Sequence, residues 1–255
     1  MKRTLAVLIL TIVLIPGVIA QEADTTGIKL PVKNVTRLKD ASYSKFIIPS
    51  ILVSYGLITR ISKPLQQLDH SVHETVSKNF PGKTHIDDYT QFTQFVPLYT
   101  LDLVGIKAAH NFRDRTFIVA TSYIIMGQTV GNMKKAFGVE RPDGSNKRAF
   151  PSGHTASAFV GAHILYKEYK DVSPWIGVAG YAVATGTGVM RVLNKRHWLS
   201  DVVAGAGVGM LSAEAGYLLL PVFHKLFRIK DNSNNLILVP SIGMDNYGIG
   251  LAYSF

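Results

Sequence analysis

Three short clusters in this 255-residue chain combine cations, histidines and small residues in a way that suits phosphoryl chemistry. They occupy residues 134–142 (KKAFGVERP), 151–154 (PSGH) and 191–201 (RVLNKRHWLSD). Lysine and arginine side chains bind phosphate oxygens, and histidine can transfer protons or attack an electrophile near neutral pH. An apolar helical chain has no structural need for such groups. The clusters therefore predict one site that binds and transforms a phosphorylated group.

The second cluster lies directly before an apolar run that predicts a helix from Thr155 onward. Ser152 can cap this helix, and the backbone N–H groups of its first turn point toward any bound anion. Gly153 lets the backbone approach a ligand closely. A simple helix cap explains Ser152 alone, but it does not explain His154, which we therefore expect to have a chemical role.

The third cluster places His197 and Asp201 four residues apart, which is one face of a helix that begins near Leu199. The carboxylate can then hold one imidazole nitrogen while the other remains free to attack. An exposed histidine–aspartate pair is the plain alternative. Arg191, six residues earlier at the end of the preceding predicted helix, favours a site because it adds a fork of phosphate-binding donors.

A zinc site is the competing interpretation, with His154, His163 and His197 as ligands. It leaves three cations without a purpose: Lys134, Arg141 and Arg191. Two histidines with no nearby cluster of carboxylates favour covalent and acid–base chemistry over metal-assisted hydrolysis. We therefore expect neither a metal nor a cofactor.

Taken together, the clusters resemble the signature of the type 2 phosphatidic acid phosphatase (PAP2) superfamily, K-x6-R-P, P-S-G-H and S-R-x5-H-x3-D, in order and spacing. The resemblance extends over about residues 92 to 223 and is greatest to bacterial membrane lipid phosphatases, such as those acting on lipid A. Met190 departs from the pattern, because the family usually has serine there. This removes one possible hydroxyl contact to phosphate.

The resemblance implies a division of roles among these residues. His197 would attack phosphorus to form a phosphohistidine, Asp201 would orient its ring, and His154 would protonate the leaving alkoxide. The residues implied to hold the phosphate oxygens are Lys134, Arg141, Ser152, Gly153 and Arg191. Vanadium-dependent haloperoxidases share this motif set and are a more distant alternative.

Hydropathy predicts an all-α fold, a bundle of about six helices. The resemblance implies that this bundle is of the PAP2/haloperoxidase type. The expected helices span residues 46–61, 92–109, 115–133, 155–169, 174–193 and 199–223. The polar stretch 62–88 is expected to be a loop or a surface helix. A short turn at 170–173 reverses the chain, so the second and third clusters should meet at one end of the bundle.

Composition favours a bundle embedded in the membrane, since 47% of the residues are apolar and only 17% are charged. Small residues at 177–180 and 204–209 permit the close helix contacts found in lipid. The net charge of +10 favours a phosphorylated membrane lipid and the bilayer as partners over nucleic acid. No protein partner is predicted. The chain has no cysteine, which excludes disulfides and thiolate-held metal.

Residues 1–20 have the basic start, apolar core and small exit residue of a signal peptide, with an uncleaved anchor as the alternative. We expect an exported arm at 21–43, the phosphatase domain at 44–230 and a C-terminal β-hairpin at 231–255. The alternating pattern at 247–255 predicts a strand that can pair with residues 236–239.

Export favours the inner membrane of a bacterial cell envelope, with the active site facing the periplasm. The hairpin's terminal aromatic strand leaves outer-membrane association, or a non-catalytic scaffold, as alternatives. Lipid A is the preferred substrate, with its 4′-phosphate as one option. Undecaprenyl pyrophosphate and phosphatidylglycerophosphate are the alternatives, and no residue separates the three.

Overall fold

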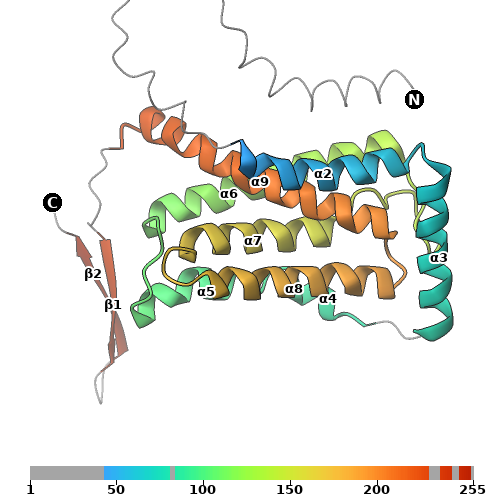
Figure 1. Ribbon diagram of the computed structural model, residues 1–255. Helices are drawn as coiled ribbons and strands as arrows, with labels where there is room; N and C mark the ends of the chain where they lie inside the picture. The colour runs from blue at the N-terminus through green and yellow to red at the C-terminus, as the bar shows by residue number, and fades with distance from the viewer. Residues whose placement is uncertain (1–42, 81–83, 230–235, 243–246, 254–255) are drawn as a thin grey trace, which may run out of the picture. The chain divides into compact units, whose positions relative to one another are not determined.

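The computed structural model describes residues 43–80 and 84–229 with their side chains, together with the backbone of 236–242 and 247–253. Its helical part is a bundle of long helices joined by turns and short helices (Figure 1). This confirms the predicted all-α bundle. The helices are α2 (Ser44–Thr59), α3 (Lys63–Asn79), α4 (Ile86–Thr90), α5 (Phe95–Thr100), α6 (Phe112–Phe137), α7 (Gly153–Tyr169), α8 (Pro174–Leu193) and α9 (Leu199–Leu226). The predicted signal segment and nearly all of the predicted arm lie outside the described residues.

Local sequence sets several of the helix ends that later matter for the site. The side chain of Asn111 accepts a hydrogen bond from the Asp114 N–H and starts α6, and Gly138, at φ 55°, ends it in the left-handed conformation. Ser152 caps α7, and Pro174 occupies the first turn of α8. The three sequence clusters therefore lie at or beside helix ends.

The predicted helix over 92–109 is wrong beyond residue 104. The structure has the short α5 followed by a 3-10 turn, Leu101–Val104, which Gly105 closes at φ 88°. The backbone after this point is tied to the end of α7, because Ala109 donates a hydrogen bond to the Glu168 carbonyl at 2.9 Å. Tertiary contact thus replaces the helix that the apolar composition predicted.

The polar stretch 62–88, expected to be a loop or surface helix, contains both α3 and α4. The α3 helix begins at Lys63 with Pro64 in its first turn, and it lies at 93° to α2 across the ends of the other helices (Figure 1). Residues 81–83 lie outside the described residues. The arrangement places α3 and α4 against the same end of the bundle as the sequence clusters.

Helices α7 and α9 approach each other very closely. A Cβ atom added at Gly205 would lie 2.6 Å from the Ser152 carbonyl oxygen, and one at Gly209 would lie 2.4 Å from the Ala156 carbonyl oxygen. On another face of α9, Gly207 admits the backbone of α2 in the same way, with Pro49 O at 2.6 Å from the added Cβ. Glycine is therefore required where α9 crosses its neighbours.

A buried carboxylate fastens three helices at a distance from the sequence clusters. Glu214 of α9 is 1% exposed and accepts hydrogen bonds from His163 and Lys167 of α7, each at 2.8 Å. Lys45 of α2 lies 3.4 Å away. A buried charge without such partners would be strongly unfavourable, so these contacts stabilise one register of the helices.

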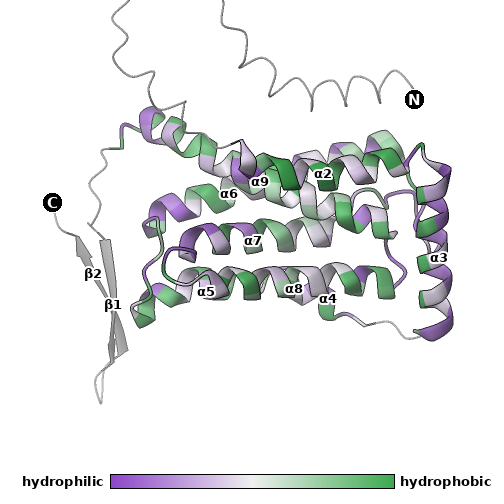
Figure 2. Cartoon of the chain, viewed as in Figure 1, coloured by the Kyte–Doolittle hydropathy of each residue, from purple (hydrophilic) through white to green (hydrophobic). Residues whose placement is uncertain are grey.

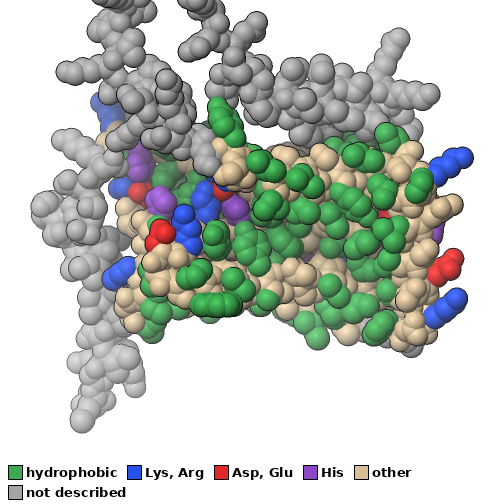
Figure 3. Space-filling view, viewed as in Figure 1, with side chains coloured by type: hydrophobic (Ala, Val, Ile, Leu, Met, Phe, Trp, Pro, Cys, Tyr) green, Lys and Arg blue, Asp and Glu red, His purple; other side chains and the backbone are tan. Residues whose placement is uncertain are grey.

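Two helices, α8 and α9, are long and apolar enough to cross a membrane, and the bent pair α2 and α3 could supply a third span. Many of their exposed side chains are large and apolar, including Ile51 on α2, Val178 on α8 and Val222 on α9. Figure 2 shows hydrophobic residues along these helices, and Figure 3 shows apolar side chains covering much of one face. A surface of this kind suits lipid and not water.

Residues 236–253 contain two antiparallel strands, β1 (Leu236–Ile242) and β2 (Tyr247–Tyr253). Their register pairs Leu236 with Tyr253 and Ile242 with Tyr247.

The close contact of α7 and α9 makes a stability prediction. We expect Gly209→Ala to lower the thermal stability of the detergent-solubilised protein, because the new methyl must displace the α7 backbone, at a cost of about 1–3 kcal/mol. Gly127→Ala on α6 is the matched control, since no described atom lies within 4 Å of its added Cβ. It should leave stability unchanged or raise it by about 0.5–1 kcal/mol. Equal melting temperatures for the two variants would contradict the close packing.

Candidate active site

The three sequence clusters meet where α6 and α8 end and α7 and α9 begin. The Ser152 N–H donates to the Asp201 carbonyl at 2.9 Å, which joins the second cluster to the third. The Trp198 indole N–H donates to the Glu140 carbonyl at 2.8 Å, which joins the third cluster to the first. The predicted convergence of the clusters is therefore found in the structure.

His197 lies in the link between α8 and α9 and is 2% exposed. Its pKa is lowered well below the ordinary value, first by burial and then by the positive charges of Lys134, Arg191 and Arg141. The imidazole is therefore neutral near pH 7. A neutral imidazole keeps a lone pair, which is the form that a nucleophile requires.

Asp201 lies beside His197, but its carboxylate is turned mainly toward the start of α9. Its Oδ2 accepts a hydrogen bond from the Trp198 N–H at 2.9 Å, whereas His197 Nδ1 lies 3.7 Å from the same oxygen. His197 and Asp201 are thus neighbours, as predicted, but 3.7 Å is the separation of an ion pair and is too long for a hydrogen bond. The reason is that His197 precedes the helix, so Asp201 is free to cap its first turn.

A second layer of polar residues, which the sequence analysis did not single out, supports Asp201. Arg60, at the end of α2, places Nη1 at 3.7 Å from Asp201 Oδ1 and Nη2 at 3.3 Å from Asp69 of α3. Asp69 also accepts the Ser200 N–H at 3.0 Å. For Arg60, its position at the end of an apolar helix was a signal in the sequence that could have identified it. Asp69 offered no such signal, because its neighbours in the sequence are those of a surface residue.

Lys134 and Arg141 border a pocket of about 300 Å³ that Asn146 and Arg148 also line. Burial, followed by the charge of Arg141, lowers the pKa of Lys134 to about 8. The loop is held in place because the Lys134 ammonium donates to the Arg148 carbonyl at 2.5 Å and the Arg141 N–H donates to the Asn146 carbonyl at 3.0 Å. This pocket carries strong positive charge and suits an anionic group.

Arg191, at the end of α8, is buried and forms an ion pair with Asp87 of α4. Asp87 is itself 1% exposed and accepts a second hydrogen bond from the Asn194 amide at 2.7 Å. Among the described residues, the Nε atom of Arg191 has no hydrogen-bond partner. One edge of the guanidinium is thus fixed by Asp87, and Nε remains able to donate.

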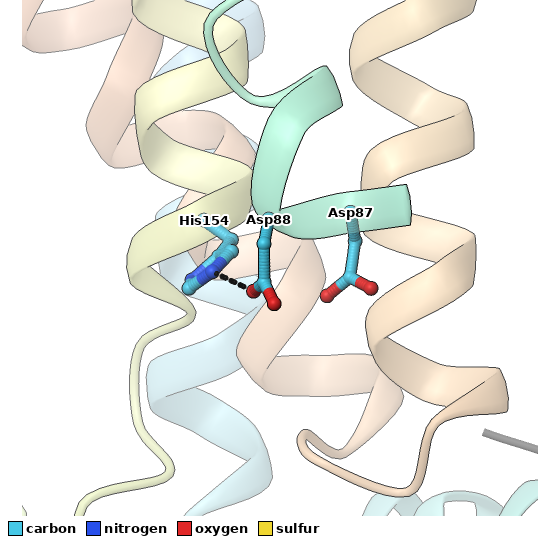
Figure 4. Close-up of side chains that lie close together, drawn as sticks. All are labelled: Asp87, Asp88 and His154. Carbon is cyan, nitrogen blue, oxygen red and sulfur yellow. Dashed lines mark hydrogen bonds and ion pairs between the residues drawn. The ribbon is translucent and has the colours of Figure 1, made fainter. Parts of the chain in front are cut away.

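His154, in the first turn of α7, contacts a second carboxylate of α4. Its Nε2 lies 2.9 Å from Asp88 Oδ1, as Figure 4 shows. Burial and the charge of Arg191 lower the pKa of His154, and Asp88 acts in the opposite direction. Sequence reasoning missed Asp87 and Asp88; two adjacent acids within a polar stretch were the available signal.

The zinc alternative loses one of its three ligands. His163 is engaged by Glu214 at 2.8 Å and by the Tyr181 hydroxyl at 2.6 Å, in the interior of the bundle. A different set, Asp87, Asp88 and His154, offers atoms within 4.8 Å of one another. Arg191 and Asn194 already occupy Asp87, so that set is better described as a charge network.

Ser152 is placed as a helix cap. Its side chain is fully buried, and its Oγ accepts hydrogen bonds from the Thr155 hydroxyl at 2.9 Å and from the Thr155 N–H at 3.5 Å. A Cβ added at Gly153 would meet only Val130, at 3.7 Å. Close packing therefore does not require Gly153. A phosphate-binding role for Ser152 and for the Gly153 backbone stays a prediction.

Residues 115–225 match the model of the PAP2 superfamily. The matched part contains α7 and α8 complete and most of α6 and α9, and with them all three sequence clusters. Arg60, Asp69, Asp87 and Asp88 precede it.

The chain is also similar to particular proteins. It is 41% identical over 135 residues to the lipid A 1-phosphatase of Porphyromonas gingivalis. The aligned region covers 52% of this chain but only 30% of that relative. The crystal structure of LpxE from Aquifex aeolicus covers 59% of this chain and 95% of its own, with 19% identity and a TM-score of 0.45. A PAP2-type phosphatidylglycerolphosphate phosphatase from Bacillus subtilis covers 72% of this chain and 98% of its own, with 19% identity and a TM-score of 0.42.

The lowered pKa of Lys134 makes a prediction for anion binding. As the pH rises through about 8, the ammonium loses its proton, so the affinity for tungstate should fall by up to about tenfold between about pH 7 and 9. Tungstate keeps its charge over this range, and titration calorimetry measures the affinity. Lys134→Arg keeps the cation and should show a much flatter profile. Parallel profiles for the two proteins would exclude Lys134 from the anion site.

Proposed function

We propose that this chain is a phosphatase that hydrolyses a phosphomonoester of a membrane lipid through a phosphohistidine intermediate. The observation that carries the proposal is a set of buried donors beside a neutral, buried imidazole. Within the described part of the chain, Arg141 Nε and Arg191 Nε have no hydrogen-bond partner, and both residues act electrostatically on His197. Buried donors are normally paired, so these two are well suited to phosphate oxygens.

The position of the site at the ends of α8 and α9 supports a lipid substrate. Both helices are candidate membrane spans, and His197 lies in the short link between them. The link is therefore near a membrane surface, where lipid phosphate groups also lie. A phosphorylated lipid could reach the site while its acyl chains remain in the bilayer.

The proposed reaction has two displacements on phosphorus. In the first, an imidazole nitrogen of His197 forms a bond to phosphorus, the bond to the lipid oxygen breaks, and His154 gives its proton to that oxygen. In the second, water loses a proton to His154 and attacks the phosphohistidine, which releases phosphate and restores His197. Asp201 stabilises the charge that the ring acquires, while Lys134, Arg141 and Arg191 balance the charge on the phosphoryl oxygens.

Lipid A is the preferred substrate, because the relative from Porphyromonas gingivalis is a lipid A 1-phosphatase. The name of that relative supports the 1-phosphate as the proposed target, in preference to the 4′-phosphate that the sequence analysis offered as an option. Undecaprenyl pyrophosphate and phosphatidylglycerophosphate remain the alternatives. The predicted signal segment at 1–20 and the candidate membrane spans within the predicted domain at 44–230 support a proposed location in the bacterial inner membrane, with the site facing the periplasm.

Substitution of the two histidines tests the reaction. We expect His197→Ala to abolish phosphate release, because no phosphoenzyme can form, and His154→Ala to lower turnover by about 10²–10⁴-fold. Both are measured by phosphate release from a lipid phosphomonoester in detergent micelles. His110→Gln, beside Glu168, is the matched histidine control and should retain activity.

The same preparations distinguish the alternatives. EDTA should leave the rate unchanged. Quenching wild-type protein in alkaline detergent should trap a phosphohistidine, recognised because it is stable to alkali and labile to acid, and His197→Ala should lack it. Retained turnover in His197→Ala would overturn the assignment. Peroxidase activity that appears only with vanadate and halide would favour a haloperoxidase.

The substrate is tested by mass spectrometry of lipids from cells with and without the gene. We expect loss of the gene to increase the amount of lipid A that retains its 1-phosphate, with no change in phosphatidylglycerophosphate. Complementation with His197→Ala is the control and should not reverse the change. Accumulation of undecaprenyl pyrophosphate instead would reassign the substrate.

A further inference from the structure

The short helix α4 presents two adjacent carboxylates to the site from outside the segment that matches the PAP2 model. Asp87 is buried against Arg191, whereas the side chain of Asp88 is 47% exposed and faces His154 (Figure 4). The mechanism above uses neither residue. Their contacts with Arg191 and His154, both assigned to the reaction, raise the question of what they contribute.

The position of α4 is fixed by contacts with α8 and the residue after it. Asn194 donates to the Thr84 carbonyl and accepts the Thr84 N–H, both at 2.9 Å. The hydroxyl groups of Thr90 and Thr187 lie 2.8 Å apart. A five-residue helix is not stable alone, so these contacts hold the two carboxylates in place.

The contact between Asp88 and His154 determines which ring nitrogen carries hydrogen. An ionised carboxylate can only accept hydrogen bonds, so His154 Nε2, at 2.9 Å from Asp88 Oδ1, must be protonated. The pKa of Asp88 is lowered, chiefly by its hydrogen bond with His154, which keeps it ionised. The second proton of the imidazolium then resides on Nδ1.

We propose that Asp88 is a positioning residue for His154, holding Nε2–H so that Nδ1 delivers the proton to the leaving oxygen. The inference rests on the proposed phosphatase function. When the P–O bond breaks, Nδ1–H transfers its proton to the lipid oxygen, and the ring becomes neutral with Nε2–H still bonded to Asp88. Nδ1 then accepts the proton of the attacking water, which regenerates the imidazolium.

The charges around His154 show why this support is needed. Burial and Arg191 of α8 lower its pKa, while Asp88 and Asp87 of α4 raise it. Of the other helices packed on α7, α6 carries Lys134 in its last turn and α9 carries Asp201 in its first turn, and these two charges interact. His85 contacts the second oxygen of Asp88 at 3.2 Å. Without Asp88, a smaller fraction of His154 would carry the proton that it must donate.

Leaving-group dependence tests the proposal. An alkoxide needs a proton as it departs, whereas p-nitrophenolate leaves with little help. We expect Asp88→Asn to lower kcat on short-chain phosphatidic acid by about ten- to a hundredfold with KM nearly unchanged, and to change kcat on p-nitrophenyl phosphate by less than about threefold. Asp171→Asn, an exposed aspartate in the turn before α8, is the matched control and should behave like the wild type.

The pH profile and a double variant give readouts that a merely structural role would not move. The alkaline limb of kcat should shift to lower pH by up to about one unit in Asp88→Asn, because the acid loses its proton sooner. Since Asp88 acts through His154, adding Asp88→Asn to His154→Ala should have no further effect on the alkyl substrate.

Three results would overturn the proposal. These are equal losses on both substrates, an unshifted pH profile, or a faster Asp88→Asn with lower KM, which would mean that Asp88 competes with phosphate. If His154→Ala keeps full activity on the alkyl substrate, the proposed function fails instead. Size-exclusion chromatography of each variant in detergent shows whether it is folded, and its tungstate affinity gives a second check. These controls distinguish a loss of activity from misfolding.

Discussion

The close approach of α7 and α9 is the constraint on which the rest of the site depends. Gly205 and Gly209 remove the side chains that would separate the two helices, and the backbone of Ser152 then reaches the Asp201 carbonyl. This brings the helix start that carries His154 beside the one that follows His197. Because α8 connects α7 to α9, its last turn, which carries Arg191, lies at the end of the bundle where α9 begins. A wider helix spacing would still allow a bundle, but it would separate His154 from His197, the proposed acid and the proposed nucleophile.

The electrostatics of the site follow from how the cations and carboxylates are distributed. Lys134, Arg141 and Arg191 all disfavour a charged His197, and burial acts in the same direction. The carboxylates pair with other groups around the centre. Asp87 forms an ion pair with Arg191, and Asp201 contacts both the Trp198 N–H at the start of α9 and Arg60. The centre therefore keeps a net positive field for an anion while its individual charges stay supported, which limits the cost of burying them.

The sequence was sufficient to predict features that depend on neighbouring residues. The bounds of α8 follow from Pro174 at one end and the polar link after Leu193, and the start of α7 follows from its serine cap. It failed where a distant contact decides the structure. The 92–109 segment loses its helix after residue 104 because Gly105 turns the chain and Glu168, more than fifty residues later, binds the following backbone. For the same reason the partners Asp69, Asp87 and Asp88 have the local sequence of surface acids, since nothing near them indicates Ser200, Arg191 or His154.

The carboxylates of α3 and α4 lie outside the segment that matches the PAP2 model, which limits how far that segment can be treated as an independent module. Residues 115–225 contain the proposed nucleophile, the proposed acid and the cations proposed to bind phosphate, yet the groups that contact Arg191, His154 and Ser200 precede that segment. A chimera that exchanged only the matched segment with the corresponding segment of a PAP2 protein would combine one protein's cations with another protein's counterions. Recombination that respects the charge pairs must therefore exchange α2 to α9 as one block, because the contacts that support the site extend beyond the matched segment.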